Sequence, residues 1–177
     1  MGRMVALLRA VNVGGRKLPM AELRALCAAL GWEDVATYIQ SGNVVFSSGM
    51  TPAEAEAALE GAVAKVYGYD APTIVRTRAE WAELAAGNPF AEAAKTEPNR
   101  IQLLVSKDRV KPGAAEAIMA KARAGETVKE APGALWFHYP EGIGTSKLTP
   151  ALIDKACGSP TTGRNYRTVQ MLLEMLG

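Results

Sequence analysis

Histidine and cysteine are scarce in this sequence, and they are the residues on which most structural metal sites depend. The 177 residues include one histidine and two cysteines, Cys27 and Cys157, which lie far apart and form no C-x-x-C motif. Zinc sites and disulfide frameworks need closely spaced ligands or pairs. No D-x-D or E-x-x-H cluster suggests a metal held by carboxylates. We therefore expect no metal, no cofactor and a reducing, cytoplasmic setting.

Long hydrophobic runs are also absent. A membrane-spanning helix needs about 20 mostly apolar residues, and no run approaches that length. The apolar stretch after Arg3 extends only from Met4 to Leu8 before Arg9 interrupts it, which is too short for the apolar region of about 7 to 15 residues in a signal peptide. With 49% hydrophobic and 21% charged residues, the composition is typical of a globular protein. We expect a soluble protein with no membrane segment.

The order of elements in residues 1–77 predicts a ferredoxin-like half. Apolar, β-rich runs predict strands at residues 3–11, 34–40, 42–48 and 71–77. Apolar residues at helical spacing predict two helices, residues 18–31 and 51–68. The second opens with a capping box of Thr51 and Glu54 and ends at Gly68. The β-α-β-β-α-β order is that of an antiparallel sheet with two helices on one face.

Residues 99–177 repeat this order more loosely. Strands are expected at residues 99–107, 126–130 and 134–140. Helices are expected at residues 112–125, at residues 149–158 with Thr149 as N-cap, and from Tyr166 to Leu176. This last helix takes the place of the final strand of the repeat.

The predicted fold class is therefore α+β, with two ferredoxin-like halves and a C-terminal helix. We place the first half at residues 1–77 and the second at residues 99–177. Residues 78–98 are expected to form a helix, opened by a capping box of Thr77 and Glu80, and a linker.

The turn after the first strand carries the first candidate site residues. Arg9 interrupts the strand, and the turn into the helix contains Asn12, Gly14, Gly15 and Lys17, with Arg16 beside them. A strand, a glycine turn and a helix in this order present backbone N–H groups to an anion. The alternative is that Arg9 simply extends to water from the edge of the strand.

A second candidate turn is GIGTSKLTP, residues 142–150, which contains Ser146 and Lys147. It lacks the spacing of a P-loop, which is G-x-x-x-x-G-K-[ST]. A glycine turn, a lysine and a helix beginning near Thr149 nevertheless suit an anion. The alternative is an ordinary loop before a capped helix, with Lys147 facing water.

The third candidate turn is TTGRNYRTV, residues 161–169. We expect Thr161 or Thr162 to cap a helix on which Arg164 and Arg167 share one face, with Asn165 between them. Two guanidinium groups at a helix start suit a carboxylate or a phosphate. The alternative is that these arginines pair with acidic helices of the other half.

The hairpin around residues 38–46 contributes Gln40, Ser41 and Asn43 at its bend. Catalytic chemistry finds little support elsewhere. His138 is expected to be a partly buried strand residue, Cys27 to lie in the core, and Cys157 to lie near a surface turn. We assign no catalytic residue, and whether the protein is an enzyme stays open.

Five segments, in order, resemble the bacterial domain-of-unknown-function 1697 family: LLRAVNVGG, TYIQSGNVVF, NPF, HYPEGIGTSKLT and TTGRNYRTV. The resemblance covers essentially the whole chain. It implies a small cytoplasmic α+β protein of two ferredoxin-like halves, and it implies no activity, substrate or catalytic residue. Ala10 stands where the family more often has glycine, and Tyr166 where tryptophan is common.

Three hypotheses of function follow. The first is a binding site for a phosphate- or carboxylate-bearing ligand, formed by Arg9, Asn12, Gly14, Gly15, Lys17, Gln40, Ser41, Asn43, Ser146, Lys147, Arg164, Asn165 and Arg167. The second is a nucleic-acid-binding module. RNA-recognition modules stack bases on aromatics of their central strands, and the third strand offers only Phe46, so this hypothesis is not favoured. The third is a structural or interaction protein in which the polar turns hold the fold together. The oligomeric state is not predicted.

Overall fold

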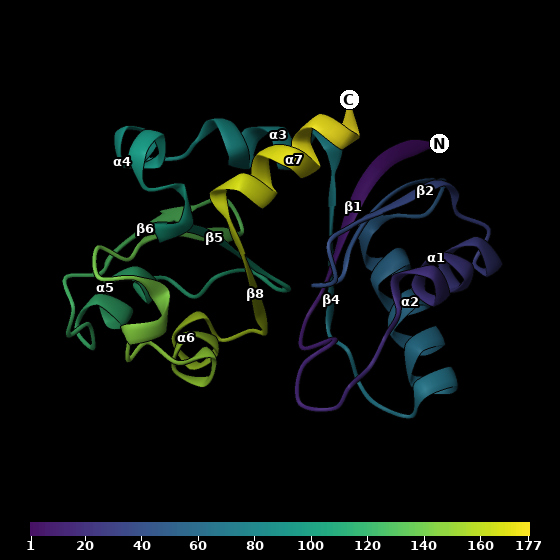
Figure 1. The fold of residues 1–177 in the computed structure, drawn as a ribbon, viewed down its shortest axis with the longest axis horizontal. Coiled ribbons are helices and arrows are strands. Elements are labelled where there is room, and N and C mark those ends of the chain that lie inside the picture. The colour runs from purple at the N-terminus through teal and green to yellow at the C-terminus, as the bar shows by residue number, and fades with distance from the viewer. The chain divides into compact units, whose positions relative to one another are not determined.

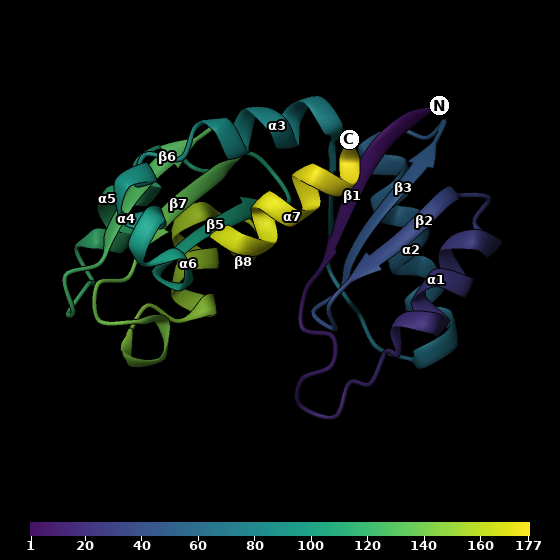
Figure 2. The same ribbon diagram turned by 45° about the horizontal axis from the view of Figure 1, so that its top comes forward.

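The structure is a computed structural model that describes residues 1–177, and the chain forms two compact units. Unit 1 comprises Met1–Ala82 and Leu172–Gly177, and unit 2 comprises Glu83–Met171. Figures 1 and 2 show their helices and strands. None of the helices has the length and apolar character that crossing a membrane requires.

Unit 1 contains a four-stranded antiparallel sheet and two helices in the ferredoxin-like order. The elements are β1 (Gly2–Leu8), α1 (Met20–Ala29), β2 (Glu33–Tyr38), β3 (Asn43–Ser48), α2 (Pro52–Tyr67) and β4 (Thr73–Thr77). The strand order is β2-β3-β1-β4, and every neighbouring pair is antiparallel. The predicted β-α-β-β-α-β order is confirmed.

Local signals in the sequence set the helix ends of unit 1. The Thr51 side chain accepts a hydrogen bond from the N–H of Glu54, whose carboxylate accepts one from the N–H of Thr51. Gly68 ends α2 in the left-handed conformation, which has no steric cost for glycine. The helix α3 (Arg78–Ala86) follows β4 directly and begins with the predicted capping box of Thr77 and Glu80.

The core of unit 1 lies between the sheet and the helices α1 and α2, which cover the same face in Figure 2. Alternate residues of β1, including Ala6 and Leu8, face these helices because side chains of a strand alternate between its two faces. Leu23 and Cys27 contribute from α1, which confirms the prediction that Cys27 is a core residue. The intervening Leu7, on the opposite face of the sheet, is buried as well.

The last turn of the chain is also part of unit 1. The helix α7 (Tyr166–Leu176) ends beside the first strand, where Arg3 Nη2 donates a hydrogen bond of 2.8 Å to the carbonyl oxygen of Met175. Arg3 Nη1 donates a second bond, 3.2 Å long, to the carbonyl oxygen of Asp34. One guanidinium therefore connects the beginning of β1 to residues distant in sequence.

Unit 2 contains a second four-stranded antiparallel sheet with the same topology. Its elements are α4 (Ala91–Thr96), the 3-10 helix η1 (Pro98–Arg100), β5 (Ile101–Ser106), α5 (Ala114–Met119), β6 (Thr127–Ala131), β7 (Ala134–His138), the 3-10 helix η2 (Ile143–Thr145), α6 (Pro150–Cys157) and β8 (Thr161–Asn165). The strand order is β6-β7-β5-β8. The predicted α+β class with two ferredoxin-like halves and a C-terminal helix is confirmed.

The expectation that a helix replaces the final strand of the repeat is wrong. Residues Thr161–Asn165 form β8, which pairs with β5 so that Gln102 lies opposite Asn165 and Ser106 opposite Thr161. This pairing satisfies backbone groups at the edge of β5 that a helix would leave without partners. The helix α7 begins one residue later, at Tyr166.

The helix expected at residues 112–125 is also shorter than predicted. It ends at Met119, after which the N–H groups of Lys121 and Ala122 bond to carbonyl oxygens three residues earlier, the tighter spacing of a 3-10 turn. Gly125 then has a φ of 73°, which is incompatible with a continuing helix.

The core of unit 2 packs α5 and α6 against β5, β6 and β7. Phe137 and Leu135 of β7 contribute from the sheet, and Ile118 and Ile153 contribute from the helices. Cys157 directly precedes the exposed turn at Gly158, as predicted, but its side chain belongs to this core with 1% of its surface exposed. The last turn of α6 directs its side chain inward, although Gly158 follows it directly.

Candidate functional site

The loops at one end of the unit 1 sheet bring the first group of predicted site residues together. Leu7 at the end of β1 pairs with Asn43 at the start of β3, and Leu8 pairs with Thr73 at the start of β4. Strand ends that pair in this way place their flanking loops side by side. The loop end of unit 1, as we name it, comprises residues 9–19, 39–42 and 68–72.

Asn12 holds two of these loops together through its side-chain amide. Its Nδ2 donates to the carbonyl oxygens of Leu18 (3.0 Å) and Gln40 (2.7 Å). Its Oδ1 accepts from the N–H of Leu18 at 2.8 Å. Both amide protons and one acceptor position are therefore occupied by the backbone of the protein, which gives Asn12 a structural role.

Asn43 has the same role in the hairpin. It is fully buried, and its Nδ2 donates to the carbonyl oxygen of Tyr38 (3.0 Å) and to Ser41 Oγ (2.9 Å). Gly42, between Ser41 and Asn43, has a φ of 82°. The Gln40 side chain faces solvent.

The cations of the loop end differ in what they contact. Arg9 is half-buried and follows β1 directly, so the expectation that it interrupts the strand is wrong. Arg16 Nη1 donates to the carbonyl oxygen of Asp70 (3.1 Å), and its guanidinium lies 5.3 Å from the centre of the Tyr69 ring. Lys17 is exposed, and its ammonium group has neither a hydrogen bond nor an ion pair.

The backbone of this loop repeatedly adopts the left-handed conformation. The φ angles are 57° at Ala10, 56° at Asn12, 57° at Gly14 and 80° at Gly15. Left-handed residues alternating with ordinary ones are typical of loops whose backbone N–H groups bind anions. Here the N–H groups of Asn12, Arg16 and Lys17 already donate to carbonyl oxygens of the same loop, which leaves those of Gly14 and Gly15 without such a partner. Glycine adopts this conformation at no cost, whereas Ala10 bears a strain of about 1–2 kcal/mol.

Helix α1 begins directly after this loop and lacks a side-chain cap. Its N-cap residue is Pro19, which has no side-chain acceptor for the N–H groups of the first turn. Glu22 supplies one negative charge in that turn. The Tyr67 hydroxyl donates a hydrogen bond to the Glu22 carboxylate, and this bond raises the pKa of Tyr67 to about 12.

In unit 2, Ser146 binds a carboxylate of the protein itself. Its Oγ donates to Glu126 Oε1 at 2.9 Å and accepts from the N–H of Leu148 at 3.2 Å. Burial of Glu126 raises the pKa of its carboxyl, but hydrogen bonds from backbone N–H groups and from Ser146 outweigh burial, so that the pKa is lowered from its ordinary value. Lys147 is exposed and has no polar partner.

Thr149 is the N-cap of α6, as predicted, and its Oγ1 accepts from the N–H of Leu152 at 3.2 Å. This bond occupies one of the helix N–H groups that an anion near Lys147 would need. The first turn of α6 is therefore a weaker anion site than that of α1, which has no such cap.

The third predicted group does not form one face of a helix. Arg164 belongs to β8 and is 7% exposed, and its Nη1 donates to Thr162 Oγ1 (2.8 Å) and to the carbonyl oxygen of Gly163 (2.9 Å). Burial lowers the pKa of Arg164 to about 10. Arg167 is exposed on α7, and Asn165 caps α7 by accepting from the N–H of Thr168 at 3.0 Å. The expectation of paired arginines fails because the strand continues to Asn165.

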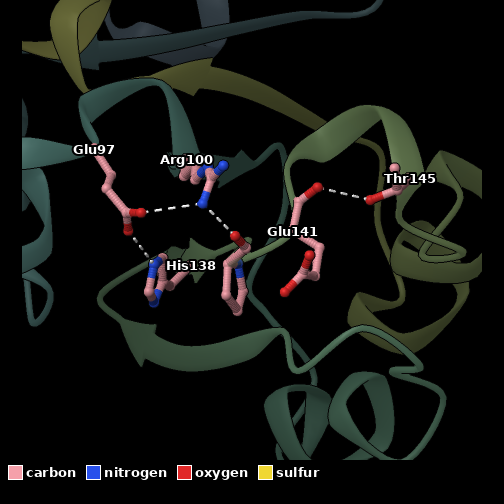
Figure 3. A network of polar contacts seen from close by, with 6 residues as sticks. Glu97, Arg100, His138, Glu141 and Thr145 are labelled. Atoms are coloured by element: carbon pink, nitrogen blue, oxygen red, sulfur yellow. Dashed lines mark hydrogen bonds and ion pairs between the residues drawn. The ribbon is translucent and has the colours of Figure 1, made fainter.

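A polar cluster beside β7 involves two residues that sequence analysis did not single out (Figure 3). The Glu97 carboxylate accepts from Arg100 Nη1 at 3.0 Å and lies 3.3 Å from Nε2 of His138. Arg100 also donates to the carbonyl oxygen of Pro140. His138 is partly buried at the end of β7, as predicted.

This cluster combines an imidazole with a carboxylate, a pair that can orient a proton donor or acceptor. Here the second oxygen of Glu97 is held by Arg100, and Arg100 is held by a backbone carbonyl. The arrangement therefore connects the segment before β5 to the end of β7. The i, i+3 spacing of Glu97 and Arg100 was the one signal in the sequence that could have indicated this ion pair.

No group of three or more His, Cys, Asp or Glu side chains is arranged to hold a metal ion. Within the loop end, the Arg16 and Lys17 cations and the uncapped N-terminus of α1 favour an anionic group of a ligand or cofactor, whereas the exposed carboxylate of Asp70 opposes one.

Comparison with known proteins gives a family and a fold. A model of the family described as "Protein of unknown function (DUF1697)" matches residues 1–136. The structure of the conserved bacterial protein SP0830 from Streptococcus pneumoniae is similar, with a TM-score of 0.77, 24% sequence identity and coverage of 99% of both chains. At this identity the likeness shows the fold alone. Comparison with curated proteins gives no match.

Proposed function

Because this chain belongs to the family of proteins of unknown function DUF1697, we propose its function from its own residues. The loop end of unit 1 binds a small ligand through a phosphate or carboxylate group. The observation that carries this proposal is that two features lie together: the ammonium group of Lys17 has no partner, and the N-terminus of α1 has no side-chain cap. Between Asn12 and Lys17, Gly14 and Gly15 keep the backbone accessible, since a Cβ at either would meet nothing within 4 Å.

The expected affinity is modest. A hydrogen bond to a charged group contributes about 1.5–3 kcal/mol, and a helix N-terminus contributes about 0.3–1 kcal/mol to an anion. Two such bonds and the helix dipole sum to about 3–7 kcal/mol, which corresponds to dissociation constants from several millimolar down to about ten micromolar. Glu22 in the first turn of α1 opposes the anion. The ligand therefore needs further contacts to bind more tightly.

The polar amides of the turns support a different hypothesis. The side-chain amides of Asn12 and Asn43 donate their hydrogen bonds to backbone carbonyl oxygens and to Ser41. Asn165 caps a helix. We propose that these residues stabilise the turns and that ligand contacts come from the cations and the backbone N–H groups.

A nucleic-acid-binding function is less favoured. Phe46, the one aromatic residue of β3, is fully buried and stacks on Trp32 with ring centres 3.8 Å apart. It therefore offers no exposed surface for a base, and binding to nucleic acid would rest on phosphate contacts. Such binding would weaken with salt by about one slope unit per phosphate contact. Retention on a single-stranded DNA matrix over a salt gradient measures this slope.

The decisive experiment is an amide-resolved NMR titration with inorganic phosphate and citrate in the millimolar range. We expect the signals of Gly14, Gly15 and the first turn of α1 to shift with saturation. Lys17→Ala should weaken the binding at least fivefold. Lys147→Ala is the matched control, because Lys147 is an exposed and partner-free lysine of unit 2. Equal affinities of both variants, or the absence of shifts at the loop end, would overturn the proposal.

We also propose a cytoplasmic location. The support is the composition, with two cysteines that are both free thiols in the structure, Cys27 in unit 1 and Cys157 in unit 2. Free buried thiols are typical of reducing compartments. Cell fractionation with an antibody against the protein tests this, and recovery in an extracytoplasmic fraction would contradict it.

A further inference from the structure

Unit 2 has a groove between α5 and α6 that none of the predicted site residues lines. Its volume is about 720 Å³, and its floor consists of Pro112, Ala117, Ala151, Leu152 and Ala156. The two helices contact each other and can be followed in Figure 1. The groove exists because the facing residues are mostly alanines, whose small side chains leave the space between the helices unfilled.

Every charged side chain that lines this groove is a lysine. Lys111 lies before α5, Lys121 lies just after it, and Lys155 lies in the last turn of α6. All three are exposed, and none of their ammonium groups makes a hydrogen bond or an ion pair. Three like charges from three segments produce a positive potential over the groove.

The one acid of α6 does not neutralise this rim. Asp154 Oδ1 accepts from the N–H of Thr161 at 3.0 Å and from its Oγ1 at 2.8 Å, so the carboxylate is directed toward β8. An apolar floor beneath an uncompensated cationic rim is complementary to a molecule with an apolar body and an anionic head. Neither a purely polar anion nor a neutral hydrocarbon uses both features.

The size of the groove decides between a small molecule and a protein partner. At 1.5 Å per residue, the six residues of α5 and the eight of α6 span about 9 and 12 Å. A stable protein interface buries about 800 Å² on each partner with about 20–30 residues, which is more than these two short helices and their flanks provide. Ligand pockets have volumes of about 300–1,000 Å³, and the groove falls within that range.

We propose that this groove binds a free medium-chain carboxylate, with the chain on the alanine-rich floor and the carboxylate among Lys111, Lys121 and Lys155. The site shares no residue with the loop end of unit 1, and its ligand differs from the small anion proposed there in needing an apolar chain beside the carboxylate. Because the floor is apolar, each methylene added to the ligand should tighten binding up to about three- to fourfold until the groove is filled. Because the rim is cationic, the alcohol of the same chain length should bind more weakly.

The test is a calorimetric titration of the full chain with hexanoate and octanoate below their micellar concentrations and with octanol below its solubility limit in water. We expect octanoate to bind more tightly than hexanoate by about tenfold, and octanol to bind at least threefold more weakly than octanoate. Lys155→Ala should weaken octanoate at least threefold. The matched control is Lys65→Ala, because Lys65 is likewise an exposed last-turn lysine, of α2.

A second variant, Ala117→Phe, places a large side chain in the floor of the groove at an exposed position. It should abolish octanoate binding while the melting temperature stays within a few degrees of the wild-type value. Binding that is independent of chain length, or equal in Lys155→Ala and wild type, would overturn the proposal. So would binding that occurs only on vesicles of anionic phospholipid, since that would identify a membrane surface as the occupant.

Discussion

Replacing Gly42 by alanine tests the closest approach in the loop end of unit 1. A Cβ on Gly42 would lie 2.8 Å from Val11 Cγ2 and 2.9 Å from Leu8 Cβ, closer than real Cβ contacts come. Both neighbours are buried, so neither can move aside without disturbing the core. The φ of 82° adds backbone strain for any residue other than glycine.

Gly68→Ala separates the two effects. Gly68 has a φ of 73°, and a Cβ there would meet nothing within 4 Å, so its substitution introduces backbone strain alone. That strain costs about 1–2 kcal/mol. Overpacking of a filled site costs about 1–3 kcal/mol more. We therefore expect Gly42→Ala to lower the free energy of unfolding by about 2–5 kcal/mol, and by at least about 1 kcal/mol more than Gly68→Ala.

Urea unfolding followed by tryptophan fluorescence measures this difference. The chain has three tryptophans, of which Trp32 and Trp81 lie in unit 1 and Trp136 in unit 2, so both variants are made in a Trp136→Phe background. Trp32 is buried and stacked on Phe46 in the core of unit 1, so the remaining emission reports on the unit that carries both substitutions. The two variants should differ in the midpoint of unfolding, with Gly42→Ala the lower. If both substitutions destabilise equally, within about 0.5 kcal/mol, the hairpin does not approach the β1–α1 loop as closely as the structure shows.

Three further predictions concern other sites. Ser146→Ala removes a donor that keeps the pKa of Glu126 low, and should cost about 1–2 kcal/mol of unfolding free energy at pH 7. A lowered pKa of the Glu126 carboxyl stabilises the fold at pH values above the ordinary pKa near 4.3, and this stabilisation is lost as the pH falls through the folded-state pKa. The urea midpoints of wild type and variant should therefore converge in acid. A gap that stays constant with pH would contradict this. Burial raises the pKa of Cys27 to about 12 and the pKa of Cys157 to about 11. A disulfide reagent at pH 8 should therefore modify both thiols quickly only after the protein is denatured. Rapid labelling of the native protein would refute their burial. Ala10→Gly should raise the unfolding free energy by about 0.5–1 kcal/mol in a urea titration, because relief of left-handed strain exceeds the entropic cost of glycine, and a loss of stability would disprove the strain.

Helix starts and the element order of the first half were predictable because their signals are local. Thr51, Thr77 and Thr149 each cap a helix through an N–H three residues further on, and that spacing is visible in the sequence. Strand β8 was missed because its determinant is pairing with β5, about 60 residues earlier in the chain. Threonine at position 161 is equally compatible with a helix N-cap and with a strand. The strand forms because the edge of β5 needs a hydrogen-bonding partner, which the local sequence does not show.

The candidate site was predictable in its residue types and not in their roles. Glycine, asparagine and cations mark the turns, but the partners of Asn12 lie 6 and 28 residues away along the chain. Nothing in the sequence shows that its amide is used for the fold while the ammonium group of Lys17 has no partner. The burial of Arg164 was hidden for the same reason, since it follows from the sheet.

The bond between Arg3 and Met175 bears on how the chain folds as it is made. Unit 1 takes its first segment from residues 1–82 and its last from residues 172–177, so unit 2 is, in sequence, an insertion within it. During synthesis from the N-terminus, all of unit 2 emerges before the final turn of α7 is available to β1. Unit 2 can thus complete its own structure first, although unit 1 begins earlier. Unit 1 therefore contains both the earliest and the latest residues of this chain to be synthesised.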